Sequence, residues 1–195
     1  MIPIPFGPAE FDALDAEIRA VFPAEQLITP DDVRRGLSTL DEAVRSVGWP
    51  TLGASRGKVL FCLDNGGKRD VYLEGHPGLE GRVLFTNAVP GSADAAFVEQ
   101  NDPLADPARI PALVQAGYIV RTRADADTEQ ARTGDTTDRN AALASGAQYV
   151  STDYPVPNPD FGTGYFVEIP DGVPGRCNPI AAPVGCRPPA LVRPF

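Results

Sequence analysis

The sequence contains few of the residues that carry proton transfer and metal chemistry in proteins. It has one histidine and three cysteines, and no Cys-x-x-Cys or Cys/His spacing occurs, so a zinc site is not expected. The formal net charge is −9, and no basic tract is present to neutralise phosphates, which argues against nucleic acid as a partner. No apolar run approaches the roughly 18–20 residues that a membrane span needs, so we expect no membrane span.

Proline, in contrast, is abundant and unevenly distributed. The chain has 195 residues, 43% of them hydrophobic and 22% charged, which suffices for a globular domain with a core. Of its 21 prolines, ten lie from Pro155 onward. We therefore predict a folded domain at 1–155 and a Pro/Gly-rich extension at 156–195.

The cysteines occur in two different contexts. Cys177 and Cys186 bracket the loop-like stretch NPIAAPVG in the extension. A disulfide between them is plausible and would imply an oxidising compartment. Cys62 lies inside the apolar run VLFCLD, where a cysteine usually acts as a small buried hydrophobic residue.

Helical patterns precede the first apolar run. Residues 9–22 carry apolar side chains at helical spacings of three and four, namely Phe11, Leu14, Ile18 and Val21. Thr29 followed by Pro30 is typical of a helix start, because threonine caps and proline fits the first helical position. Ser38 is the expected N-cap of a further helix at 38–48.

Four apolar runs predict strands that are covered on both faces, as in a parallel sheet. They lie within 57–67, 81–91, 116–125 and 146–155. The segments between them are helical or mixed, and one of these is SADAAFVEQ at 92–100. Serial β–α units of this kind predict an α/β fold with about four parallel strands.

Polar residues follow each run at its C-terminal end. They are Asp64, Asn65, Thr86, Asn87, Arg121, Arg123, Asp125, Ser151, Thr152 and Asp153. The C-terminal ends of parallel strands lie on one side of a sheet, where β/α barrels and open α/β sheets place their chemistry. We therefore expect these side chains to gather around one site. The alternative is turn chemistry before Gly66 for Asp64 and Asn65, and a cap or turn before Pro155 for Asp153.

The stretch VRTRADAD at 120–127 places four charges on one face of a predicted strand, because strand side chains alternate. The charged residues are Arg121, Arg123, Asp125 and Asp127. Burying such ions is costly, so we interpret them as a polar site near a barrel mouth. A self-satisfied ion-pair cluster or a solvent-exposed face is the alternative.

Four segments resemble the bacterial family of calcium-dependent phosphoinositide-specific phospholipase C-like proteins. They are GKVLFCLDN, YLEGHPGLEGRVLFTNA, VRTRADADTEQART and GAQYVSTDYP, and the similarity runs from about residue 9 to about residue 185. This family belongs to the phosphatidylinositol phospholipase C and glycerophosphodiester phosphodiesterase superfamily of TIM-type barrels. Because a complete barrel needs about 250 residues, the resemblance implies a partial (half) TIM-type β/α barrel, roughly strands five to eight. Met1 is then expected to be internal to a longer reading frame.

The resemblance also implies roles for the predicted site. The family carries its paired catalytic histidines and most calcium ligands in the other half, and His76, in the turn-like EGHPG, has no neighbour to orient it as a base. We therefore expect no catalytic residue here. Arg121 and Arg123 suit a phosphate or polyhydroxyl head group. The other implied substrate-binding residues are Asp64, Asn65, Asp125 and Asp153, which could accept substrate hydroxyls, help to bind calcium or, as we favour for Asp125, orient the arginines.

The chain is accordingly interpreted as the substrate-facing half of a phosphoinositide phospholipase C-like phosphodiesterase, a phosphoric diester hydrolase that is incomplete and inactive alone. The implied cofactor is calcium, and the implied substrate is a phosphoinositide or another phosphodiester. The alternative is a non-catalytic secreted α/β module that binds phosphate or sugar head groups. A nucleotide-binding open sheet is less favoured, because no Gly-x-Gly-x-x-Gly pattern follows any strand.

Two further expectations concern the setting of the protein. We expect it to be secreted or periplasmic as part of a longer protein, although the start MIPIPFGPAEFD lacks the basic and apolar regions of a signal peptide. A half-barrel exposes strand edges, which favours association through those edges.

Overall fold

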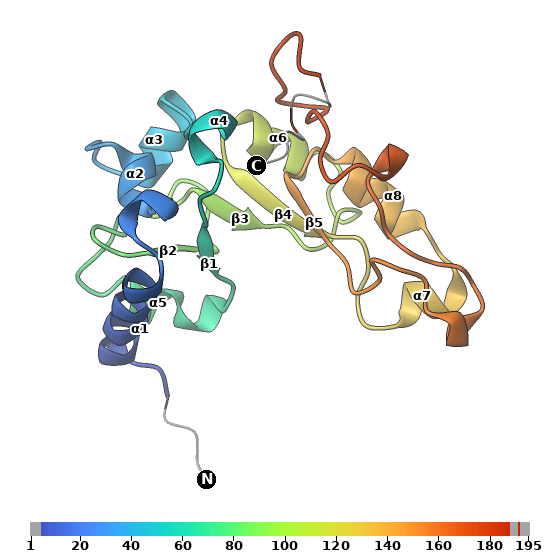
Figure 1. The fold of residues 1–195 in the computed structure, drawn as a ribbon, viewed down its shortest axis with the longest axis horizontal. Helices are drawn as coiled ribbons and strands as arrows, with labels where there is room; N and C mark the ends of the chain where they lie inside the picture. Colours follow the sequence, from blue (N-terminus) through green and yellow to red (C-terminus); the bar gives the residue numbers. More distant parts are fainter. Residues whose placement is uncertain (1–4, 188–190, 192–195) are drawn as a thin grey trace. The chain divides into compact units, whose positions relative to one another are not determined.

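The computed structural model describes residues 5–187 and 191, which divide into two compact units. The first unit extends to Val98, and the second begins at Glu99. Most helices of the first unit precede its strands, whereas helices lie between the strands of the second unit (Figure 1). The fold is therefore of the α/β class, as the sequence predicts.

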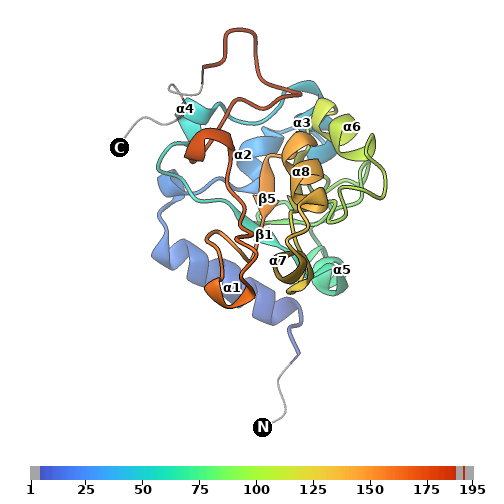
Figure 2. The same ribbon diagram turned by 90° about the vertical axis from the view of Figure 1, so that its right-hand side faces the viewer.

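The helices of the first unit begin at recognisable N-caps. They are α1 (Pro8–Val21), α2 (Pro30–Arg34), α3 (Leu40–Ser46), α4 (Leu52–Ser55) and α5 (Arg69–Tyr72), with 3₁₀ turns η1 (Ala24–Gln26) and η2 (Gly66–Lys68). Phe11 and Ile18 of the predicted stripe are buried in α1. Thr29 and Asp32 form a capping box at α2, which satisfies two free backbone N–H groups. Helices α2 and α3 lie side by side (Figures 1 and 2).

A two-stranded parallel sheet forms the centre of the first unit. β1 (Phe61–Leu63) pairs with β2 (Leu84–Thr86), with Cys62 opposite Phe85. A further parallel bridge joins Leu27 to Val59, so the pairing continues on the other side of β1. β2 is buried along its whole length, including its last residue Thr86, as expected of a strand covered on both faces.

A buried tyrosine holds the beginning of β2. The Tyr72 hydroxyl donates to Asp15 at 2.7 Å and accepts the backbone N–H groups of Val83 and Leu84. Burial, with the hydrogen bond to Asp15, raises the pKa of Tyr72 well above its ordinary value, so the hydroxyl keeps its proton. The guanidinium of Arg82 lies over the tyrosine ring and binds Asp15 at 3.3 Å, which balances the buried carboxylate.

The second unit contains a sheet in the order β3-β4-β5. Its strands are β3 (Phe97–Glu99), which ends at the first residue of the unit, β4 (Ile119–Arg123) and β5 (Tyr149–Ser151). β4 pairs with β5 in parallel, with Thr122 opposite Val150. The helices are α6 (Arg109–Gln115), α7 (Glu129–Thr133) and α8 (Thr137–Ala144), with 3₁₀ turns η3 (Pro159–Phe161) and η4 (Pro170–Gly172).

β4 shows the alternation expected of a strand with one covered face. Val120 and Thr122 are fully buried, whereas Arg123 is exposed. The covered face continues into a hydrophobic cluster of Ala124, Ala131, Ala142, Tyr154, Tyr165 and Val167. This cluster joins the end of β4, α7, α8 and the segment after β5. The other face of β4 carries Arg121 and Arg123.

Two local expectations are wrong. SADAAFVEQ was expected to be helical or mixed, but it contains β3, because Phe97 and Val98 are buried and Asn87 bridges to Phe97. Helix α3 is capped by Thr39 and not by Ser38, since the Thr39 hydroxyl accepts the Glu42 N–H at 3.0 Å.

The parallel strands form sheets of two and three, without a closed barrel over the described part of the chain.

The Pro-rich segment after residue 155 is packed onto the second unit. The Val167 N–H donates to Tyr154 O at 2.9 Å. A disulfide links Cys177 and Cys186, and Asn178 within this loop donates to Gly146 O. Residues 188–190 and 192–195 of the predicted extension lie outside the described residues, and the boundary proposed at 155 stays a prediction.

Candidate functional site

A pocket of about 390 Å³ lies at the C-terminal end of β4. Its polar lining consists of Asn101, Asp102, Arg123, Asp125 and Asp138. β4 supplies the arginine, the loop after β3 supplies two residues, and the first turn of α8 supplies Asp138. A pocket at the C-terminal ends of neighbouring strands is where α/β proteins bind their ligands.

Among the described residues of this lining, Arg123 is the only cation, and it is exposed to solvent. Across residues 5–187 and 191, no hydrogen bond or ion pair engages its guanidinium. An arginine held at a strand end without a protein partner offers its planar set of N–H donors to a ligand. The geometry therefore favours an anion or a polyol at this position.

Asp125 is a buried carboxylate that is held by neutral donors. Asp125 is only 5% exposed, and its Oδ2 accepts the Thr152 hydroxyl at 2.5 Å. Oδ1 accepts the Asp153 N–H at 2.9 Å, and the Tyr165 hydroxyl lies 3.2 Å from Oδ2. These bonds tie the end of β4 to the end of β5. The expectation that Asp125 orients the arginines is therefore not met by the geometry, because its oxygens are directed at other donors.

The other two carboxylates of the lining are also engaged. Asp102 Oδ1 accepts the N–H groups of Leu104 and Ala105 at 2.9 and 3.0 Å, an arrangement that closes the turn after β3. Asp138 Oδ2 accepts the Gln130 amide at 2.7 Å. Both side chains line the pocket, and carboxylate oxygens can also accept hydroxyl donors.

Arg121 lies on the same face of β4 as Arg123 but has protein partners. Its guanidinium donates to Asn101 Oδ1 at 3.0 Å and lies 3.6 Å from the Glu99 carboxylate. Its side chain is 19% exposed. The contacts of Arg121 agree with the ion-pair interpretation, while substrate binding by Arg121 and Arg123 stays a prediction.

Asp127 and Asp153 lie near the pocket without entering its lining. Asp153 is exposed, and its backbone N–H is the group that contacts Asp125. Asp127 is exposed and has a φ of 53°, a left-handed conformation that aspartate tolerates better than most residues. Its carbonyl accepts the Tyr154 hydroxyl at 3.0 Å. The side chain of Asp127 therefore does not continue the strand face predicted for it.

Asp64 and Asn65 belong to the first unit. Both are exposed and follow β1 directly, and the Lys68 N–H donates to Asn65 O at 2.9 Å where η2 begins. This contact agrees with the turn interpretation of Asn65. Because the pocket at β4 belongs to the second unit, the predicted gathering of Asp64 with Arg123 stays a prediction.

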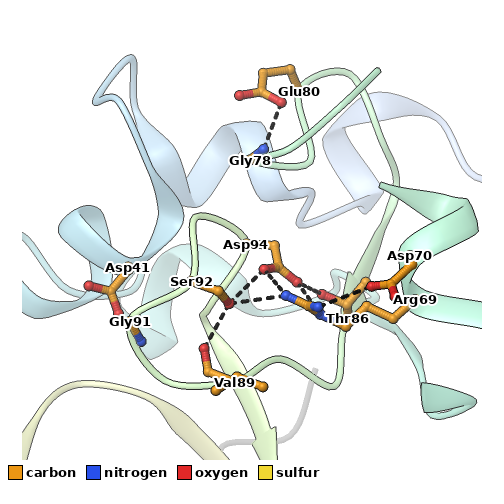
Figure 3. A network of polar contacts seen from close by, with 10 residues as sticks. All are labelled: Asp41, Arg69, Asp70, Gly78, Glu80, Thr86, Val89, Gly91, Ser92 and Asp94. Atoms are coloured by element: carbon orange, nitrogen blue, oxygen red, sulfur yellow. Dashed lines mark hydrogen bonds and ion pairs between the residues drawn. The ribbon is translucent and has the colours of Figure 1, made fainter. Parts of the chain in front are cut away.

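The end of β2 carries a closed polar network, drawn in Figure 3. Asp94 is 1% exposed and accepts two bonds from Arg69, one from Thr86 and one from Ser92. Burial raises the pKa of the Asp94 carboxyl, but the bonds from Arg69, Thr86 and Ser92 outweigh it and hold the pKa below its ordinary value. With its charges mutually satisfied, this network holds the loop after β2 and offers no group to a ligand.

His76 is half-buried and bonded within its own turn. Its Nδ1 lies 2.6 Å from the Glu80 carbonyl oxygen, which can only accept, so Nδ1 carries the proton. Gly78 and Glu80 close the same turn through a backbone N–H to carboxylate bond. The His76 ring is therefore held within its own turn, and the expectation that it plays no catalytic part stays a prediction.

Neither a metal site nor a membrane span is apparent in the part of the chain that the structure describes. No group of three or more His, Cys, Asp or Glu side chains is arranged to hold a metal ion there. Likewise, none of the helices within residues 5–187 and 191 has the length and apolar character to cross a bilayer.

Sequence reasoning missed several residues at this pocket. Asn101 and Asp102 follow β3, so recognising that strand would have marked them as strand-end residues like the others. Asp138 lies in the first turn of α8, where an acidic residue is common for helix stability and does not by itself indicate a site. Tyr165 comes from the Pro-rich segment and carries no pattern that links it to Asp125.

Comparisons with known proteins support these observations. Residues 1–179 match the family described as phosphoinositide phospholipase C, Ca²⁺-dependent. A solved structure of a Ca²⁺-dependent phosphatidylinositol-specific phospholipase C from Streptomyces antibioticus aligns with a TM-score of 0.50 and 21% identity. The alignment covers 75% of this chain and 58% of that chain, and at this identity it shows the fold alone. No curated protein matches. Because the family match spans most of its length, the chain belongs to the Ca²⁺-dependent phosphoinositide phospholipase C family.

Proposed function

We propose that this chain forms the substrate-facing part of a phosphoinositide phospholipase C-like phosphodiesterase and recognises the phosphate-bearing head group. The observation that carries the proposal is Arg123, an exposed guanidinium without a protein partner among the described residues, in a strand-end pocket of a chain from this family. Arginine suits phosphate because its N–H groups match phosphate oxygens two at a time.

Each remaining polar group of the site has a role in this proposal. Arg121, held by Glu99 and Asn101, stays a predicted substrate contact on the same face of β4 as Arg123. Asp138 and Asp102 accept hydroxyl protons of a polyol, since their carboxylates face the pocket. Asp64, Asn65 and Asp153 stay predicted substrate contacts, supported by their positions after β1 and β5.

The chain is proposed to be inactive on its own. Cleavage of a phosphodiester needs a base for the attacking hydroxyl and an acid for the leaving oxygen. His76 is the one histidine of the sequence, and its Nδ1 is bonded to Glu80 O. The acidic side chains of the described part do not form a cluster that fits calcium, so we assign no step to that ion and expect its ligands outside this set of residues.

A turnover assay tests the catalytic part of this proposal. The purified chain should release no product from phosphatidylinositol or glycerophosphodiesters, with or without calcium. Turnover that is lost on changing His76 to Ala would contradict the assignment. In a longer protein that contains this chain, Arg123→Ala should reduce kcat/KM by about tenfold or more, since it removes charge-assisted bonds to phosphate.

Secretion and association are further parts of the proposal. The Cys177–Cys186 disulfide supports an oxidising, extracellular or periplasmic location. Strands in open sheets of two and three favour association through their edges with a polypeptide that supplies the remaining barrel strands. Restored turnover on mixing this chain with such a polypeptide would support the proposal. Head-group binding without turnover in every mixture would instead favour a non-catalytic binding module.

A further inference from the structure

Among the described residues, Arg123 has no carboxylate partner, although three carboxylates line the same pocket. An arginine next to acidic side chains ordinarily forms an ion pair, because the attraction between unit charges persists even near a protein surface. One oxygen of Asp102 and one of Asp138 accept other donors, whereas both oxygens of Asp125 do so. Asp125 is thus the acid of this lining whose carboxylate is engaged on both oxygens.

Asp125 is the most important of the three, because it follows Arg123 by two residues and is the most buried. Asp125 also lines the same pocket as Arg123, so its carboxylate is close enough to compete for the guanidinium if its present donors are lost. The donors of Thr152 and Tyr165 instead direct its Oδ2 toward the end of β5. A buried carboxylate that loses such donors must find a new partner.

Tyr165 is suited to this task by its own surroundings. It is 3% exposed, and its ring packs edge-on against Tyr154. Its hydroxyl oxygen lies 3.2 Å from Asp125 Oδ2 and 3.0 Å from Ala124 O, and the charged carboxylate is the stronger acceptor of its one proton. Burial, with the charge of Asp125, raises the Tyr165 pKa above its ordinary value, so the proton stays on the hydroxyl.

We propose that Tyr165 is a positioning residue that, together with Thr152, keeps the Asp125 carboxylate bound at the end of β5 and thereby leaves Arg123 available to an anionic ligand. The inference rests on the proposed role of Arg123 in binding phosphate. It makes the segment after β5 a functional part of the site, because this segment holds the acid that would otherwise neutralise the arginine.

The experiment uses the full chain and inorganic phosphate as the probe. The variant Tyr165→Phe keeps the ring but removes the hydroxyl, and Tyr154→Phe is the matched control because its hydroxyl bonds the Asp127 carbonyl instead. Tyr165→Phe should weaken phosphate binding by roughly tenfold, the size expected for losing one bond to a charged group. Tyr154→Phe should bind phosphate as the original chain does.

A rescue separates positioning from a general loss of structure. Asp125→Asn cannot form an ion pair with Arg123, so adding it to Tyr165→Phe should restore phosphate binding. Failure of this rescue would overturn the inference, as would unchanged phosphate binding in Tyr165→Phe. If Tyr165→Phe does not fold, Thr152→Val removes the other hydroxyl donor to Oδ2 and is read with the same Asp125→Asn rescue.

A spectroscopic reading distinguishes failure of this inference from failure of the proposed function. The Arg123 Nε–H signal, assigned by its loss in Arg123→Lys, should shift in Tyr165→Phe as the new ion pair forms and return in the double variant. If the original chain and Arg123→Ala bind phosphate equally well, the proposed function fails. The Arg123 Nε–H signal still tests whether Tyr165 keeps Asp125 away from Arg123. An Arg123 signal that is the same in the original chain and Tyr165→Phe overturns it.

Discussion

The two units place arginine and aspartate near strand ends in opposite electrostatic arrangements. In the first, Asp94 is almost completely buried and binds Arg69 through both carboxylate oxygens. In the second, Arg123 is exposed, and Asp125 is bonded by hydroxyls and a backbone N–H. The same residue types therefore close one strand end and leave the other open to a ligand.

A strand end that stabilises the fold and a strand end that can bind a ligand differ here in how their charges are paired, and not in whether charges are present. Removing one member of a buried pair leaves an uncompensated charge, which is strongly destabilising. Removing an exposed, unpaired arginine leaves nothing unsatisfied, so its loss should affect binding and not folding. The following predictions test this difference, beginning with the largest effect.

Asp94→Ala should lower the free energy of unfolding of the first unit by about 3–5 kcal/mol, because Arg69 would lose its buried partner. Urea denaturation followed by Trp49 fluorescence reports on this unit, since the Trp49 ring packs against Phe85. Asp70→Ala is the matched control, because Asp70 also contacts Arg69 but its side chain is 94% exposed. Equal effects of the two variants would contradict the structural role given to Asp94.

Replacing Cys177 and Cys186 together by serine should lower the stability of the second unit by about 2–3 kcal/mol, since the disulfide closes a short loop. Urea denaturation followed by circular dichroism measures the change. Thiol counting on the oxidised chain should find one thiol, from Cys62. Three thiols would mean that the bridge is absent in solution.

Acidification should destabilise the first unit to a smaller extent than Asp94→Ala, because a protonated carboxyl keeps its hydrogen-bonding oxygens. The Asp94 pKa is lowered in the folded chain, so its stabilising contribution is present above the ordinary carboxyl pKa of about 4 and is lost as the pH falls below that value. The stability difference between the original chain and Asp94→Asn should therefore narrow toward low pH. A difference that is constant across this range would show that the ionised form is not favoured.

Arg123→Ala should change the free energy of unfolding by less than about 0.5 kcal/mol, the range usual for exposed positions without special contacts. Phosphate binding should nevertheless fall, since the one cation of the pocket is removed. Unfolding and phosphate titration of the same preparation check both statements. A decrease in the free energy of unfolding as large as that of Asp94→Ala would mean that Arg123 stabilises the fold.

Patterned features of the fold were accessible from the sequence. The stripe of Phe11 and Ile18, the cap at Thr29 and the apolar runs containing β1, β2, β4 and β5 all follow from side-chain periodicity and backbone hydrogen-bonding needs. β3 was missed because its residues lie in SADAAFVEQ, where alanines and acidic residues interrupt the apolar pattern, and the segment became a strand through its neighbours. The family and the α/β class were recognisable for the same reason, since both are carried by local segments.

The sequence by itself determined that Arg121, Arg123 and Asp125 would come at the end of a strand, because alternation and the apolar run before them are local properties. Only the tertiary structure decided which of these charges would be paired. Glu99 and Asn101 reach Arg121, and Thr152 and Tyr165 reach Asp125, from parts of the chain that are distant in sequence. Pairing depends on distances of a few ångströms between such groups, and only folding sets those distances.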